Sequence, residues 1–140
     1  MPRVKKIDHV GIAVRDAEAA VRFYEEALGL AADHYETVPA QGVKVAFLPL
    51  GEATLELLEP TGPDTPVGKY LDKRGEGIHH ICLEVEGLDE LLGELSARGA
   101  VIGSGAAAPG AHGSRVGFLH PKATGGVLVE LAEKGHEPET

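Results

Sequence analysis

Two stretches of sequence decide the fold: Ile7-Asp-His-Val-Gly-Ile-Ala-Val14 and, 71 residues later, Ile78-His-His-Ile-Cys-Leu-Glu-Val85. Both alternate in polarity and are rich in β-branched residues, which predicts a strand in each. A second pair, Ala53-Thr-Leu-Glu-Leu-Leu58 and Gly126-Val-Leu-Val-Glu-Leu131, repeats with its glutamates 74 residues apart. Repetition of two separate stretches at nearly the same offset predicts that the chain consists of two similar halves.

A helix is predicted after the first strand of each half. In the first half, Asp16 caps a helix over residues 17–28, and Gly29 ends it. In the second half, Asp89 or the loop before it begins a helix that ends at Gly99.

Extended segments follow each predicted helix. Residues 43–50 and 53–58 form a predicted hairpin, and residues 115–120 and 127–132 match them in the second half. Each half therefore reads β-α-β-β-β. The predicted fold class is α+β, with two βαβββ modules whose sheets cup a central metal site.

The two predicted modules are joined by a short helical connector. Thr65-Pro66 supplies a cap and a first helical position, and Gly75 ends the helix. The predicted boundaries are 1–62 for the first module, 63–76 for the connector, and 77–140 for the second module with a polar C-terminal tail.

The composition excludes several classes of protein. The formal net charge of the 140 residues is -9, whereas a nucleic-acid binder carries positive charge to neutralise phosphates. An acidic membrane surface would repel the chain. The single cysteine, Cys82, rules out an intramolecular disulfide. The chain has neither a signal-peptide pattern nor an apolar run long enough to span a membrane, so we expect a cytoplasmic protein.

Four residues recur in register and are predicted to hold one divalent metal ion. They are His9 and Glu56 in the first half, and His80 and Glu130 in the second. Strand alternation puts His9 on the face of small residues, opposite the bulky face that packs under the helix. A glutamate in an apolar strand is costly to bury unless a cation or donor compensates it. Two imidazoles and two carboxylates suit a divalent ion and leave two positions of an octahedron open.

Other candidates are less clearly marked. His79, aligned with Asp8, either orients its neighbours or is a core histidine. Ser114 follows a glycine-rich loop and is a candidate donor to the substrate, or a turn residue. Lys122 is a candidate for contact with phosphates, or a solvated turn lysine. His112 and His120 are loop or turn residues, or line the pocket. His34 and His136 have no supporting cluster.

An ordered set of motifs resembles a known family over nearly the whole chain. The motifs are residues 7–14, 41–48, 56–60, 77–81, 110–113, 118–122 and 125–131. They resemble the vicinal oxygen chelate, or glyoxalase-like, superfamily, and within it the methylmalonyl-CoA epimerase family.

The resemblance implies interconversion of the (2R) and (2S) epimers of methylmalonyl-CoA, a step of propionate metabolism. It implies metal ligands at His9, Glu56, His80 and Glu130, with Co²⁺ the expected ion and Mn²⁺, Ni²⁺ or Zn²⁺ as alternatives. The expected partner is a small CoA thioester, and the expected assembly is a homodimer.

Removal of the C2 proton creates an enolate, and inversion needs acid/base groups on both faces of the substrate. Glu130 and Glu56 are the candidate pair. Some family members instead place a glutamate, credited as a base, at the position of Val45, together with a glutamine ligand where this chain has Glu56. Other members share the arrangement found here.

Three other functions are compatible with the same scaffold. A glyoxalase I-like lyase would act on the hemithioacetal of glutathione with the same metal and proton transfer. An extradiol dioxygenase-like protein favours iron held by two histidines and one carboxylate, and the fourth ligand argues against it. A non-catalytic ligand-binding module does not need two carboxylates around a metal. Fold alone does not separate these functions.

Overall fold

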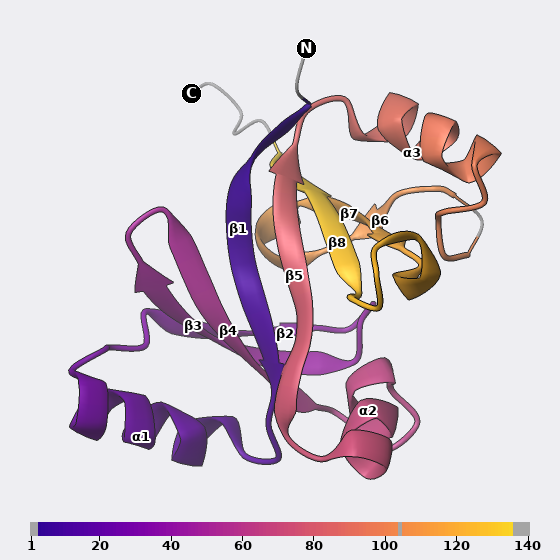
Figure 1. The fold of residues 1–140 in the computed structure, drawn as a ribbon. Coiled ribbons are helices and arrows are strands. Elements are labelled where there is room, and N and C mark those ends of the chain that lie inside the picture. The colour runs from indigo at the N-terminus through magenta and orange to yellow at the C-terminus, as the bar shows by residue number, and fades with distance from the viewer. Residues whose placement is uncertain (1–2, 104, 136–140) are drawn as a thin grey trace. The chain divides into compact units, whose positions relative to one another are not determined.

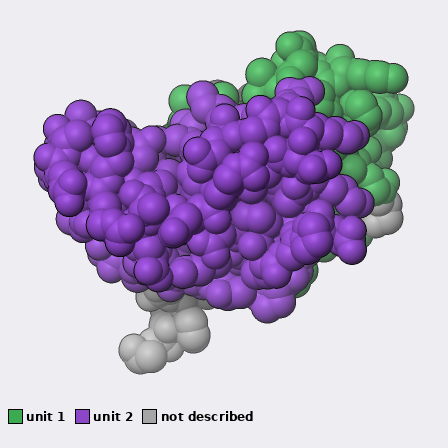
Figure 2. Space-filling view, turned by 90° about the horizontal axis from the view of Figure 1, so that it is seen from below, with its two compact units in different colours: residues 1–7, 81–140 green, residues 8–80 purple. Residues whose placement is uncertain are grey.

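The structure is a computed structural model that describes residues 3–103 and 105–135. The chain divides into two compact units (Figure 2). Unit 2 comprises residues 8–80, and unit 1 comprises residues 1–7 with residues 81–140. Strands β1 (Val4–Ala13) and β5 (Gly77–Val85), labelled in Figure 1, contain the two stretches that define the repeat. Each strand contributes residues to both units.

Unit 2 carries the strands of the first predicted module. Its strand order is β2 (His34–Val38), β3 (Val43–Leu50), β4 (Ala53–Pro60), then β1. β1 and β4 are parallel, whereas β2–β3 and β3–β4 are antiparallel. The hairpin predicted between residues 43 and 58 is confirmed, and β2 is the remaining strand of the βαβββ pattern, which the sequence did not locate.

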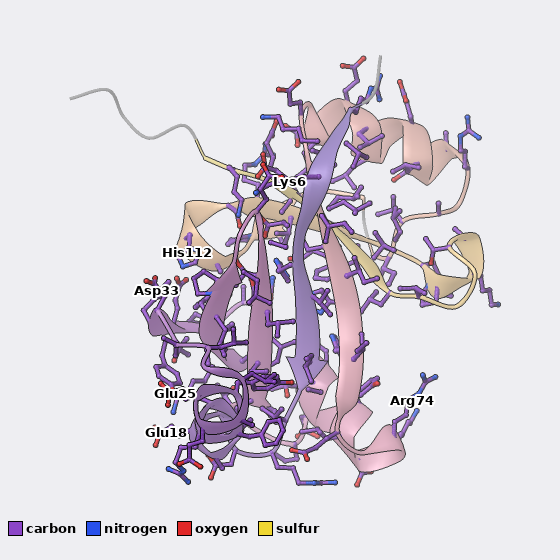
Figure 3. All side chains as sticks on the ribbon, turned by 60° about the vertical axis from the view of Figure 1, so that its left-hand side comes forward. Lys6, Glu18, Glu25, Asp33, Arg74 and His112 are labelled. Carbon is purple, nitrogen blue, oxygen red and sulfur yellow. The ribbon has the colours of Figure 1, made fainter. Side chains whose placement is uncertain are left out.

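Helix α1 (Ala17–Leu28) has the bounds that its capping residues predict. Asp16 Oδ1 accepts from the Ala19 N–H at 3.1 Å, and Gly29 adopts a left-handed conformation with φ 70°. The helix covers one face of the sheet over a buried aliphatic cluster: Val14, Ala17, Val21, Ala46, Leu48 and Leu57. Ile12 packs against this cluster, so the bulky face of β1 lies under the helix as predicted. The acidic side chains Glu18 and Glu25 point away from α1 (Figure 3).

Helix α2 (Pro66–Arg74) is also set by local signals. Thr65 Oγ1 accepts from the Gly68 N–H at 3.0 Å, Pro66 occupies the first helical position, and the helix ends at Gly75. The short helix predicted for the connector is therefore present, with the predicted cap and end.

Unit 1 carries the remaining strands. They follow the order β5, β8 (Val129–Glu133), β7 (Arg115–Leu119), β6 (Ala108–Pro109). β5 and β8 are parallel, and β7 is antiparallel to both β8 and β6. Two short 3₁₀ helices, η1 (Ala111–Gly113) and η2 (Pro121–Ala123), flank β7.

Helix α3 (Leu88–Ala97) begins differently from the Asp89 cap considered in the sequence. Gly87 is the N-cap, no side chain caps the helix in the usual way, and Asp89 lies in the first turn. The Gly87 N–H instead donates to Glu133 Oε2 at 2.9 Å. A carboxylate from the last strand thus satisfies the helix start. The preceding loop, the other option in the sequence, is the correct one.

The α+β class with two βαβββ modules is confirmed. Within residues 3–103 and 105–135, no helix is long and apolar enough to cross a membrane.

Candidate functional site

The first two candidate ligands face one another across the parallel pair β1–β4. Gly11 is directly opposite Glu56, and His9 lies two residues before Gly11, so both side chains project from the same face. His9 Nδ1 lies 3.0 Å from Glu56 Oε2. His9 is 6% exposed and Glu56 is 8% exposed. The register that brings them together joins residues 47 positions apart in the chain, as the repeat predicted.

His80 from β5 completes a buried cluster in unit 2. Its Nε2 lies 3.0 Å from His9 Nε2, and the two rings meet edge to face with centroids 5.1 Å apart. A Cβ atom on Gly11 would lie 2.4 Å from His80 Cε1. The absence of a side chain at Gly11 therefore makes room for the His80 ring, which gives the small-residue face of β1 a specific purpose.

The separation of the two imidazole nitrogens fits a divalent ion. Metal–nitrogen bonds of about 2.1 Å would put atoms 3.0 Å apart at about 90° around the ion. The two buried imidazole nitrogens are suitable donors for a first-row divalent metal, whereas Glu56 Oε2 contacts the other ring nitrogen of His9. The role of Glu56 as a ligand stays a prediction.

Both histidines are also held at their second ring nitrogen. His9 Nδ1 lies 2.7 Å from Asp8 Oδ2, and His80 Nδ1 lies 2.9 Å from His79 Nδ1. His79 therefore contacts the neighbour that it would orient, and that role stays a prediction. The ring of Tyr70 from α2 packs edge to face on His79, with centroids 5.1 Å apart.

Glu130 belongs to unit 1 and is 4% exposed. It is directly opposite Cys82 in the parallel pair β5–β8, and opposite Phe118 in the antiparallel pair β7–β8. The environment of Glu56 in unit 2 has the same form, because Glu56 is opposite Gly11 and Phe47. The two glutamates therefore have equivalent positions in their modules. The role of Glu130 as a ligand stays a prediction.

Ser114 and Lys122, the candidate substrate contacts, take part in local hydrogen bonds. Ser114 is buried, and its hydroxyl donates to the Ala111 carbonyl at 2.7 Å, which closes the turn around η1. Lys122 lies in η2, where its backbone N–H donates to His120 Nδ1 at 3.2 Å. Substrate contact by either side chain stays a prediction.

Three further residues were singled out in the sequence: Cys82, His112 and His136. Cys82 is fully buried against Val116 and Ala132. His112 has a left-handed backbone with φ 55° in η1. His136 lies outside the described residues.

Sequence reasoning missed the surroundings of His34. The ring stacks on Phe47 with centroids 4.5 Å apart and an interplanar angle of 13°, and His34 Nδ1 lies 2.7 Å from Asp33 Oδ2. Asp33 is labelled in Figure 3, next to the start of β2. His34 is opposite Phe47, which is opposite Glu56, so these three side chains project from the same face. The alternation over residues 34–38 was the signal for this strand.

Comparison with known proteins gives consistent matches. The model of the family described as Glyoxalase/Bleomycin resistance protein/Dioxygenase superfamily matches residues 8–118. The chain is 43% identical over 132 residues to the ethylmalonyl-CoA/methylmalonyl-CoA epimerase of Cereibacter sphaeroides, covering 93% of this chain and 98% of that protein.

Two solved structures extend the likeness to the whole fold. Methylmalonyl-CoA epimerase from Mycobacterium tuberculosis has a TM-score of 0.89 at 36% identity, covering 97% of this chain and 92% of that one. A variant of the Streptomyces coelicolor methylmalonyl-CoA epimerase, in complex with 2-nitronate-propionyl-CoA, has a TM-score of 0.88 at 39% identity. That match covers 95% of this chain and 99% of the other.

Proposed function

Because the chain belongs to the Glyoxalase/Bleomycin resistance protein/Dioxygenase superfamily, we propose that it is an isomerase that interconverts (2R)- and (2S)-methylmalonyl-CoA. The observation that carries the proposal is the buried cluster of His9, Glu56 and His80, in a chain whose relatives over nearly its full length are named as epimerases of this substrate. The reaction removes the proton at C2 and returns one to the opposite face, through an enolate.

The proposed metal ligands are His9, Glu56 and His80 from unit 2 and Glu130 from unit 1. Glu130 is included because its strand register repeats that of Glu56. The two carboxylates would neutralise a doubly charged ion. When bound, the ion supplies electrostatic stabilisation of the negative charge that develops on the thioester oxygen. Co²⁺ is the proposed ion, with Mn²⁺, Ni²⁺ or Zn²⁺ as alternatives.

The proposed acid/base pair is Glu56 and Glu130. One carboxylate accepts the C2 proton on its face, and the other delivers a proton to the opposite face. Because the two residues are equivalents in different modules, pseudo-symmetry supports their assignment to opposite faces. Val45 is 2% exposed, and the residue directly across from it in β4 is Leu58. That position supplies no carboxylate, so Glu56 is the proposed base of the first module.

The substrate is proposed to be a CoA thioester, the class named for the relatives. Ser114 and Lys122 remain proposed substrate contacts. A homodimer in the cytoplasm is proposed as well. Light scattering coupled to gel filtration tests the assembly, and cell fractionation tests the location.

The test of the function is proton exchange at C2. Methylmalonyl-CoA is incubated with Co²⁺-loaded protein in D₂O, and the recovered substrate is examined by NMR. We expect deuterium at C2 and a mixture of both epimers. Metal-stripped protein and the hemithioacetal of glutathione are the controls. Conversion of the hemithioacetal, with the C2 proton of methylmalonyl-CoA left in place, would refute the epimerase and favour a glyoxalase I-like lyase.

A further inference from the structure

Each proposed histidine ligand is in contact, through Nδ1, with the residue that precedes it in the chain. Asp8 Oδ2 lies 2.7 Å from His9 Nδ1, and His79 Nδ1 lies 2.9 Å from His80 Nδ1. Asp8 and His79 are 71 residues apart and thus occupy equivalent positions in the two modules. Both modules therefore have a contact between the histidine Nδ1 and the preceding side chain. In the first module that side chain is a carboxylate, and in the second it is an imidazole.

The metal requirement determines where the hydrogens lie. A neutral imidazole that binds metal through Nε2 carries its hydrogen on Nδ1. For His9, that hydrogen is donated to the carboxylate of Asp8 at 2.7 Å, the nearer of two carboxylates, since Glu56 Oε2 lies 3.0 Å from the same nitrogen. An ionised carboxylate is an acceptor only. For His80, the Nδ1 hydrogen is donated to His79 only if His79 Nδ1 carries a lone pair. His79 must then hold its own hydrogen on Nε2. If His79 Nδ1 instead donated to His80 Nδ1, the neutral His80 ring would carry its hydrogen on Nε2, and that nitrogen could not bind the metal.

We propose that Asp8 and His79 are the positioning residues of the metal centre, and that they are unequal. This inference rests on the proposed metal site. A hydrogen bond to a carboxylate is stronger than one to a neutral acceptor, and it increases the electron density that an imidazole offers a metal. His9 is therefore the stronger of the two nitrogen ligands. His79 sets the tautomer of His80 without supplying negative charge.

Helix α2 holds His79 in the orientation that this role requires. The Tyr70 ring packs edge to face on the His79 ring at 75°, and the Tyr70 hydroxyl donates to the Ile78 carbonyl at 2.7 Å. Both contacts come from one residue of α2 and fall on neighbouring positions of β5. This helix thus takes part in building the site.

The tautomers are tested directly by ¹⁵N NMR of the histidine side chains in protein loaded with diamagnetic Zn²⁺. We expect His80 to carry its hydrogen on Nδ1 and His79 to carry its hydrogen on Nε2. A Zn²⁺-loaded protein with the His79 hydrogen on Nδ1 would overturn the proposal.

The inequality is tested by metal affinity in matched variants. His79→Asn keeps an acceptor near the position of Nδ1, and His79→Leu removes it. We expect His79→Leu to weaken Zn²⁺ binding on the order of 10-fold, His79→Asn to stay near wild type, and Asp8→Asn to lose more than His79→Leu. Unfolding temperatures of the metal-free variants report whether each still folds.

Two results would contradict the assignment. One is wild-type affinity in His79→Leu, and the other is an equal loss in His79→Asn and His79→Leu, which indicates packing alone. Zn²⁺ binding does not depend on epimerase activity, so failure here leaves the C2 exchange result standing. Failure of C2 exchange likewise leaves these measurements interpretable.

Discussion

The two modules share their strand register and differ in the side chains that stand on it. Glu56 is opposite Gly11 in the first module, and Glu130 is opposite Cys82 in the second. Gly11 leaves space for the His80 ring, whereas the side chain of Cys82 is fully buried in an apolar cluster. The strand register is the same in both modules. Only the first module has a glycine opposite its glutamate, and this glycine leaves space for the His80 ring.

The attachment of each helix to its sheet has been kept as well. The Ala17 N–H donates to Glu59 Oε1 at the start of α1, and the Gly87 N–H donates to Glu133 Oε2 at the start of α3, both at 2.9 Å. A carboxylate at the end of the last strand thus meets the start of the helix in both modules. The two halves therefore differ near the histidines and agree at the helix starts.

The largest effect is expected from removing one histidine of either module. His9→Ala and His80→Ala should each lose the metal, because each removes a proposed ligand of the same ion. Elemental analysis after loading with Co²⁺ should fall from about one ion per chain in the wild type to nearly none. Equal metal content in the wild type and the double variant would break the ligand assignment for both modules.

A similarly large effect is expected at the residue that distinguishes the modules. Gly11→Ala places a methyl group 2.4 Å from His80 Cε1, so the ring must move from its position beside Gly11. We expect loss of metal binding and a destabilisation of about 1–3 kcal/mol from overpacking. Isothermal titration and thermal unfolding measure the two effects.

Gly62→Ala is the matched control, since an added Cβ there has nothing within 4 Å. Full metal affinity in Gly11→Ala would mean that the close approach of His80 to β1 is dispensable.

The next test compares the two glutamates. Glu56→Gln should abolish epimerisation and leave metal bound if Glu56 is a base, and Glu130→Gln should still permit one-sided exchange at C2. The double variant Val45→Glu with Glu56→Gln should recover activity. Val45 lies on the same face as Phe47, which is opposite Glu56. Near-normal turnover by Glu56→Gln at full metal occupancy would remove Glu56 as a base and move the search for the second base elsewhere.

The smallest effect concerns ion pairs that recur between helix and sheet. Lys44 Nζ lies 3.2 Å from Glu18 Oε1, and Arg115 Nη2 lies 2.5 Å from Asp89 Oδ1. Arg115 follows Lys44 by 71 residues, and Asp89 follows Glu18 by the same number. The hydrogen bond from Arg115 lowers the pKa of Asp89, and the hydrogen bond to Glu18 raises the pKa of Lys44. The carboxylates of Glu18 and Asp89 are exposed, and the side chains of Lys44 and Arg115 are partly exposed, so water screens each pair and each pair is weak.

The two pairs should respond to pH in opposite directions. Because the pKa of Asp89 is lowered in the folded state, its contribution is present above the ordinary aspartate pKa and is lost as pH falls through the folded value. Because the pKa of Lys44 is raised, its contribution is present at neutral pH and is lost as pH rises through the folded value.

Asp89→Asn should therefore lower the unfolding temperature slightly at pH 7 and leave it unchanged at strongly acidic pH. Glu18→Gln is the counterpart in the first module, with a slight loss at pH 7 that disappears at strongly alkaline pH. A loss in Asp89→Asn that persists at acidic pH would indicate packing rather than charge.

The sequence alone determined the features that depend on neighbouring residues. Capping side chains, proline and glycine act within one turn, so the bounds of α1 and α2 followed from Asp16, Gly29, Thr65 and Gly75. Internal repetition then identified His9, Glu56, His80 and Glu130, because a duplicated pattern carries information about distant positions without a structure. The sequence left two starts open for α3, because the carboxylate that accepts from the Gly87 N–H belongs to Glu133, 46 residues away.

Only the tertiary structure decided which atoms meet. Strand register sets whether Glu56 lies opposite Gly11, and side-chain packing sets whether His34 stacks on Phe47 or His79 turns toward His80. A strand's alternation tells which face a residue occupies, but the pairing of that strand with a partner is a nonlocal choice made by the buried face as a whole. The tautomer of a histidine depends on a single neighbouring atom, which no pattern in the chain specifies.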